Sequence, residues 1–175
     1  MKDMELKELA KHLDEEVLAR CAGDQDLEGP EDGFTEVMLE YLAREGQVDT
    51  WELGYAKKPG RRGAPAFKIN AWHVHSQGED DSAPIVDLFV TLYDTDSGGE
   101  AVPKARIAEH FQWARNFLEA SLTGFGGKMN EMEESAPPYE SVQTIYRRRT
   151  ELETARIFLL LTRAIFKRHI VYVWI

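Results

Sequence analysis

Two apolar runs separated by a polar loop dominate the pattern of hydrophobic and polar positions along the chain. The runs are Phe67–His75 and Ile85–Tyr93, and the segment between them carries glycine, proline and several acids. Runs rich in β-branched and aromatic residues on either side of a polar connection predict a β-hairpin. Both faces of the second run are largely apolar, which is typical of a strand covered on both sides. We therefore expect this hairpin to lie at the centre of the fold.

The first run also predicts which side chains share a face. Successive side chains of a strand point to opposite faces of its sheet. One face would carry Phe67, Ile69, Ala71, His73 and His75. The two histidines could then bind a metal if a third ligand converged on them. The simpler interpretation places them at a strand end, beside the polar loop.

The segments before and after the hairpin predict helices that cover the sheet. Apolar positions spaced three and four apart are typical of such helices. We expect helices over residues 3–20, from about Phe34 to Gly46, over 103–122 and over Tyr139–Glu153, and further strands at Val48–Lys57, Arg156–Thr162 and Ile170–Ile175. For Arg156–Thr162, continuation of the preceding helix is the alternative. The result is one α/β domain over residues 1–175. Its mixed sheet would have about four to five strands, with helices on both faces.

Asp87 is the one acidic residue within the second apolar run. Burying a lone carboxylate costs much free energy, so it must be hydrogen-bonded, paired with a cation or bound to a metal. This requirement makes Asp87 the first candidate for a functional residue.

The predicted order of helix, three strands, helix and strand is that of the restriction-endonuclease-like core. That core holds Mg²⁺ with a strand Asp and a Glu-X-Lys motif, often joined by a helical Glu. Asp87 would be the strand ligand, Glu40 or Glu36 the helical ligand, and Lys68 an electrostatic helper. The Glu-X-Lys motif is missing. An active Mg²⁺- or Mn²⁺-dependent nuclease, a degenerate nuclease-like scaffold and a different α/β arrangement all stay open.

The charge of the chain restricts how it could bind nucleic acid. Acids outnumber Lys and Arg by 31 to 21, so the formal net charge is −10. Such a surface disfavours broad nucleic-acid binding, because neutralising phosphates requires clustered cations. Two local clusters remain as candidates, at Arg61 and Arg62 and at Arg147, Arg148 and Arg149. The alternative is that these arginines are solvated or pair with surface acids.

The cysteine content and the N-terminus indicate a cytoplasmic setting. Cys21 is the only cysteine, so no internal disulfide and no cysteine-based zinc site can form. The N-terminal segment lacks the apolar core of a secretory signal. No uncharged apolar run reaches the roughly 20 residues that a membrane helix needs.

Several segments resemble a known family. They read FTEVMLEYLAREGQVDTWELGYAKKPGRRGAPAFKINAWHVH and IVDLFVTLYD, with shorter similarity in the helix RNFLEASL and the strand RIFLLLT. Together they resemble the N-terminal region of abortive infection phage resistance (AIPR) proteins, over about residues 30–165. The resemblance implies a bacterial cytoplasmic protein linked to phage defence.

The resemblance also orders the candidate residues. As candidate functional positions, the resemblance suggests Asp87 first and Glu40 second. Lys68 and Asn70 follow as neighbours on the preceding strand. Members of the family are usually much longer than this chain. Since the sequence stops within the apolar run VYVWI, we expect the N-terminal part of a longer protein, or an edge that pairs with a partner or a second copy.

Three functions follow from these observations. The first is a sensing, docking or oligomerising domain of an anti-phage defence protein, built on a nuclease-like scaffold. The second is a metal-dependent nuclease that uses Asp87, Glu40 and Lys68. The third is a nucleic-acid-binding module without cleavage.

Overall fold

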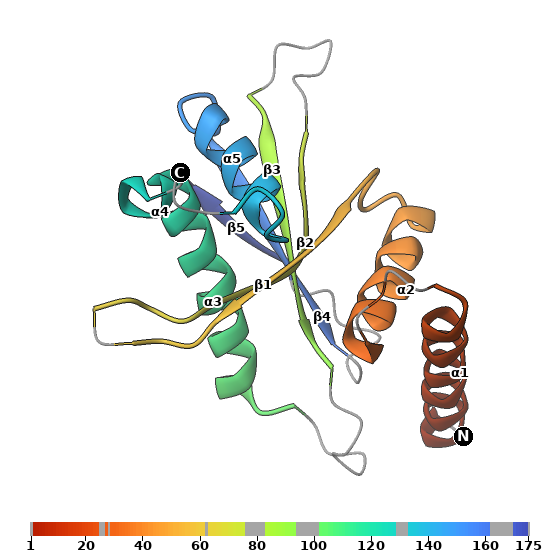
Figure 1. Cartoon of the computed structure of the whole chain (residues 1–175). Coiled ribbons are helices and arrows are strands. Elements are labelled where there is room, and N and C mark those ends of the chain that lie inside the picture. Colours follow the sequence, from red (N-terminus) through yellow and green to blue (C-terminus); the bar gives the residue numbers. More distant parts are fainter. Residues whose placement is uncertain are drawn as a thin grey trace.

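The computed structural model describes residues 2–24, 27, 29–61, 63–75, 83–93, 102–128, 133–161 and 170–174. A five-stranded mixed sheet forms its centre (Figure 1). The strands lie side by side in chain order: β1 (Glu52–Lys58), β2 (Phe67–Val74), β3 (Ile85–Leu92), β4 (Thr154–Leu161) and β5 (Ile170–Trp174).

Strand direction follows from the connections. β1, β2 and β3 form an antiparallel meander, β3 and β4 run parallel, and β5 is antiparallel to β4. The parallel step from β3 to β4 needs a long crossover, which α3, α4 and α5 supply. β3 is therefore the middle strand, and seven of its eight residues are buried, as its two apolar faces predicted.

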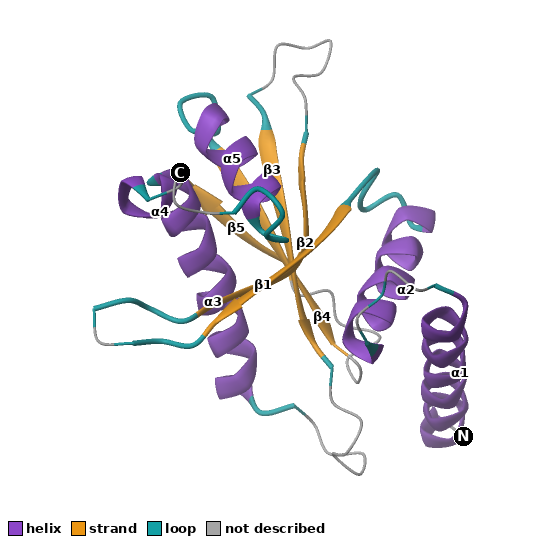
Figure 2. Ribbon diagram, viewed as in Figure 1, coloured by secondary structure: helices purple, strands orange, loops and turns teal. Residues whose placement is uncertain are grey.

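Helices cover both faces of the sheet, which confirms the predicted α/β class (Figure 2). On one side α2 (Pro30–Arg44) packs against β2 and β3, and α1 (Lys2–Gly23) packs against α2. On the other side lie α3 (Lys104–Leu122), the short α4 (Gly124–Gly127) and α5 (Tyr139–Arg148). Alternate residues of β3 feed the two resulting cores: Leu88 and Val90 join the core beneath α3, and Phe89 joins the core beneath α2.

α2 begins four residues earlier than the predicted start near Phe34. Its first residue is Pro30, followed by the acids Glu31 and Asp32 in the first turn. Proline suits this position because its missing N–H would have no helical partner there, and acids favour the positive end of the helix dipole. The earlier start brings Glu31 into the folded domain.

The predicted alternation of faces in β2 is wrong beyond Asn70. Ile69 and Trp72 both pack in the core beneath α3, whereas Ala71 packs in the core beneath α2. The pairing of β2 with β3 covers residues only from Ala71 onward. Before that point the Asn70 side-chain carbonyl, and not a backbone carbonyl, accepts the N–H of Thr91 at 2.8 Å. Asn70 thus compensates for the loss of a regular ladder where β2 bends away from β3.

The strand prediction for the tail is confirmed, since β4 and β5 both pair in the sheet. Among the residues that the structure describes, no helix combines the length and apolar character needed to cross a membrane.

Candidate functional site

Two polar clusters interrupt the core on the α2 side of the sheet, near opposite ends of β3. The first, here called the Asp87 cluster, consists of Asp87, His75, Arg148 and Arg156. The second, the Lys68 cluster, consists of Lys68, Glu31, Asn70, Thr91 and Thr35. Together they contain most of the buried polar side chains of β2 and β3.

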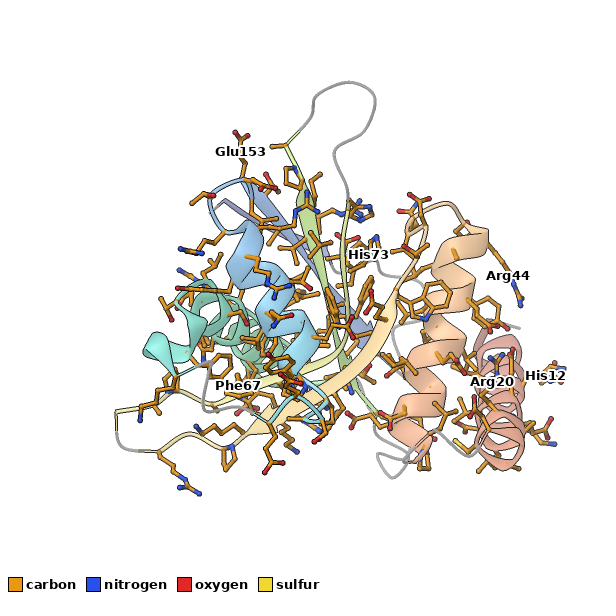
Figure 3. All side chains as sticks on the ribbon, turned by 45° about the horizontal axis from the view of Figure 1, so that its top comes forward. His12, Arg20, Arg44, Phe67, His73 and Glu153 are labelled. Carbon is orange, nitrogen blue, oxygen red and sulfur yellow. The ribbon has the colours of Figure 1, made fainter. Side chains whose placement is uncertain are left out.

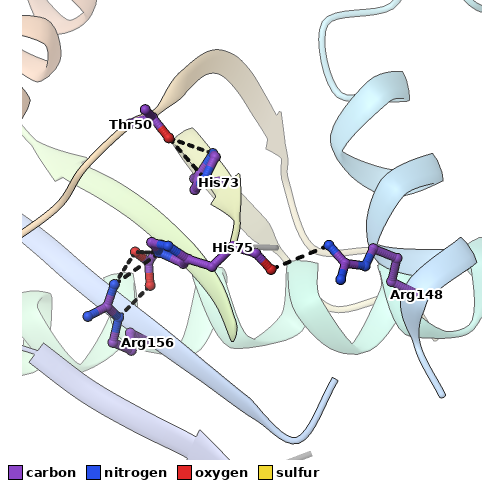
Figure 4. A network of polar contacts seen from close by, with 6 residues as sticks. Thr50, His73, His75, Arg148 and Arg156 are labelled. Carbon is purple, nitrogen blue, oxygen red and sulfur yellow. Dashed lines mark hydrogen bonds and ion pairs between the residues drawn. The ribbon is translucent and has the colours of Figure 1, made fainter. Parts of the chain in front are cut away.

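The Asp87 carboxylate is fully buried and is held by two neighbouring strands (Figure 4). Arg156 stands opposite Asp87 in the parallel ladder of β3 and β4. Its Nε lies 2.6 Å from Oδ1 and its Nη2 lies 2.5 Å from Oδ2, so the pair is bidentate. His75, directly after β2, places Nε2 at 2.7 Å from Oδ2. Two hydrogen bonds from the Arg156 guanidinium and the contact with the His75 imidazole therefore satisfy the buried carboxylate.

Further contacts join the Asp87 cluster to α5 and to the neighbouring residues His73 and Thr50. Arg148, at the end of α5, donates from Nη1 to the His75 carbonyl at 3.3 Å. The rings of His73 and His75 meet edge to face, with centroids 4.8 Å apart, so the two histidines share a face as predicted. The Thr50 hydroxyl lies 2.9 Å from Nε2 of His73. Burial and the neighbouring His75 lower the pKa of His73.

These contacts leave the cluster poorly suited to a metal. Both oxygens of Asp87 accept hydrogen bonds from Arg156, whose positive charge would oppose a cation at the same place. Within the described ranges, no group of three or more His, Cys, Asp or Glu side chains could hold a metal ion. With Arg156 in this position, the Asp87 carboxylate is not arranged to hold Mg²⁺.

The structure does not join the two predicted metal ligands. Glu40 accepts a hydrogen bond from Arg20 of α1 at 2.7 Å, and the same guanidinium lies 3.1 Å from Glu36. Arg20 lowers the pKa of Glu40, and the hydrogen bond that Arg20 donates to Glu40 raises the pKa of Arg20. Glu36 and Glu40 thus hold α1 against α2, and the assignment of Asp87 and Glu40 as metal ligands stays a prediction.

Lys68 does meet a helical acid, but that acid is Glu31. Its Nζ lies 2.6 Å from the Glu31 carboxylate and 2.8 Å from the Thr91 carbonyl. Asn70 donates to the same Glu31 oxygen at 2.7 Å, and the Thr35 and Thr91 hydroxyls are 2.7 Å apart. Burial lowers the pKa of Lys68, whose side chain is only 4% exposed.

Sequence reasoning missed Glu31 because it placed this residue in the loop before the helix. The signal that could have found it is Pro30, since proline is common at the first position of a helix and the next residue then lies in the first turn. The predicted role of Lys68 as an electrostatic helper beside Asp87 and Glu40 stays a prediction; in the structure Lys68 pairs with Glu31.

The two predicted arginine clusters lie apart. Arg61 is exposed at the tip of the β1–β2 hairpin, whereas Arg147 and Arg149 are exposed near the end of α5. The hairpin tip and the end of α5 lie apart in both Figure 1 and Figure 3. Arg62 lies outside the described residues. Arg148 also donates to Glu151, and Arg149 stacks over the Tyr146 ring at 4.1 Å. Internal contacts therefore occupy two of the three α5 arginines.

His110 is a second histidine with a shifted pKa. It lies on α3, is 5% exposed, and donates from Nδ1 to the Arg106 carbonyl at 2.8 Å. Burial lowers its pKa, as it does for His73. The folded state thus favours the neutral form of both imidazoles.

Comparison with known families gives one match. The model of the abortive infection phage resistance protein N-terminal domain matches residues 34–171, well over half of the chain. The match runs from α2 into β5 and bears out the resemblance read from the sequence. No curated protein and no solved structure matches significantly.

The Asp87–Arg156 pair predicts a structural phenotype. Asp87→Asn should lower the free energy of unfolding by about 3 kcal/mol, because it leaves a partly buried guanidinium without its counter-charge. Glu40→Gln is the matched control and should cost about 1 kcal/mol or less, since its pair is more exposed. Urea unfolding measures both. Equal losses for the two variants would contradict a structural role for the pair.

The two shifted histidines predict a loss of stability in mild acid. A histidine whose pKa is lowered on folding contributes stability that is complete above its unfolded value, about 6.5, and is lost as the pH falls below it. The urea midpoint should therefore decline between about pH 7 and pH 5, and His73→Asn together with His110→Asn should flatten that decline. His12→Asn, at an exposed position, is the control and should leave the decline unchanged.

Proposed function

We propose that this chain, which belongs to the abortive infection phage resistance N-terminal domain family, gives a phage-defence protein a non-catalytic domain for sensing, docking or oligomerisation. In this proposal it works in the bacterial cytoplasm on a nuclease-like scaffold that has lost its metal site. The family membership supports the phage-defence setting. The geometry of the two polar clusters supports the non-catalytic role.

The observation that carries the proposal is that Arg156 already binds both carboxylate oxygens of Asp87. A metal-dependent nuclease needs carboxylates that are free to hold the ion and, through it, the phosphoryl group and a water. Here Arg156 takes both oxygens of Asp87, and Glu31 neutralises Lys68. Each candidate catalytic group is thus satisfied within the protein.

The order of elements supports the nuclease-like part of the proposal. Helix α2, strands β1 to β3, helix α3 and, after the additional helices α4 and α5, strand β4 occur in the order expected for the restriction-endonuclease-like core described above. A fold of this class can carry many functions, so the order supports a scaffold and not an activity.

The position of β5 supports a role in association. It is the last strand in the sheet order, so one of its edges has no partner strand among the described residues. Its sequence, IVYVW, is apolar throughout. An open edge of this composition is a template for strand addition from another chain.

The absence of catalysis is tested by cleavage assays on single- and double-stranded DNA and RNA with Mg²⁺ or Mn²⁺, and with EDTA as the control. We expect no metal-dependent cleavage by the wild-type chain. Metal-dependent cleavage that Asp87→Asn abolishes while circular dichroism shows an intact fold would contradict the proposal and support the nuclease alternative. Cleavage that survives this variant would point to a contaminant.

Association is tested by light scattering coupled to size-exclusion chromatography over a range of concentrations. We expect a species larger than the 20.0 kDa monomer, or a specific protein retained when the chain is used as bait. A clean monomer that retains no partner would remove the docking and oligomerising roles.

A further inference from the structure

The hairpin formed by β1 and β2 carries the main unneutralised positive charge of the described chain. No acidic residue stands between Glu52 and Glu79 in the sequence. Lys57, Lys58 and Arg61 are all exposed in this interval. Among described residues, none of these three forms a salt bridge, whereas Lys11, Arg44 and Arg115 on the helices each pair with a neighbouring acid.

The hairpin is a stiff projection. Arg61 and Ala64 exchange two backbone hydrogen bonds of 2.9 Å each, which close the tip. Asn116 of α3 donates to the Ala66 carbonyl at 2.6 Å and anchors the second strand. Figure 1 shows the tip extending past α3, away from the rest of the sheet. Its cations thus lie on a projecting ribbon whose backbone is tied at the tip and to α3.

The register places positive charge on both faces of this ribbon. Lys57 stands opposite Lys68, which points toward α2, and Lys58 stands opposite Phe67, which packs toward α3. Since neighbouring residues of a strand point to opposite faces, Lys57 and Lys58 project from different sides. Arg61 adds a third charge at the tip.

This arrangement matches a groove with phosphates along both walls. The major groove of B-form DNA is about 12 Å wide and admits a two-stranded β-ribbon. We propose that the β1–β2 hairpin is an arm that binds double-stranded DNA, with Lys57, Lys58 and Arg61 contacting phosphates on the two sides of the groove.

The composition of the arm favours DNA over two other partners. Pro59 and Pro65 flank the tip and lack backbone N–H groups, which makes the tip a poor edge for adding a peptide strand. The major groove of A-form RNA is deep and narrow, which excludes a ribbon of this width. Because the proposed contacts of Lys57, Lys58 and Arg61 are to phosphates, which carry no sequence information, binding should be independent of sequence.

The number of contacts sets the expected salt dependence. Each phosphate contact contributes a slope of about −0.9 to the plot of log affinity against log salt concentration, so three contacts give about −2.7. The dissociation constant should fall within the range of about 10⁻⁴ to 10⁻⁶ M that is typical of nonspecific binding at physiological salt.

The test uses the full chain and a fluorescein-labelled 20-base-pair DNA of random sequence in an anisotropy titration. The variant Lys58→Glu/Arg61→Glu reverses two cations of the arm and leaves Lys57 beside the Lys68 cluster unchanged. The control Lys11→Glu/Arg44→Glu also reverses one lysine and one arginine at exposed positions. Both variants make the formal charge more negative by the same amount, so a difference between them reports the position of the charges.

We expect the arm variant to lose about tenfold or more in affinity and to lower the magnitude of the salt slope by about 2, while the control changes little. Unlabelled duplex DNA should compete better than single-stranded DNA or double-stranded RNA. No binding by the wild-type chain at 50 mM salt, equal losses in the two variants, or better competition by RNA would overturn the proposal. A larger loss for Arg147→Glu/Arg149→Glu would instead assign binding to α5.

Discussion

The need to bury a carboxylate in the middle strand organises much of this domain. Asp87 is fully buried in β3, where an unpaired charge would be very unfavourable. The two hydrogen bonds from Arg156 and the contact with His75 remove that cost, and they join β4 and the end of β2 to β3. Because the β3–β4 pairing is parallel, a pair at this position helps to define the register of the crossover. The polar residue that looked most like a catalyst thus acts as a link between strands.

A second constraint operates at the other end of β3, where β2 leaves the regular ladder. The loss of pairing exposes backbone groups of Thr91 inside the protein, and such groups must be satisfied. Asn70 accepts the Thr91 N–H, and Lys68 donates to the Thr91 carbonyl. Glu31 then neutralises Lys68 and accepts from Asn70. The polar groups of these residues thus satisfy the backbone and one another where the regular pairing of β2 with β3 ends.

The sequence predicted the elements better than it predicted their contacts. Long apolar runs and helical periodicity identified the five strands and the main helices, because these patterns reflect local burial. The predicted face of Ala71 was wrong because an irregularity in strand pairing shifts the following side chains to the opposite face of the sheet. The pattern of apolar and polar residues gives no sign of such an irregularity. The partners of Asp87 were not predictable because Arg156 is 69 residues away and only the parallel register brings them together. Glu31 was missed through a helix boundary, which is the least certain part of any such prediction.

The buried polar groups of both clusters are paired within the protein, which separates them from the groups that could contact other molecules. In a metal enzyme, carboxylates that await an ion repel one another and lower the stability of the protein without the metal. Here each buried charge has an internal counter-charge or hydrogen bond, and no described buried side-chain polar atom lacks a partner. The buried polar groups therefore need no ligand to satisfy their hydrogen bonds. The groups that are left to interact lie at its margins, on the cationic hairpin and on the open edge of β5. Under the proposed role, the domain would act through what these marginal groups bind, while the buried clusters maintain the fold.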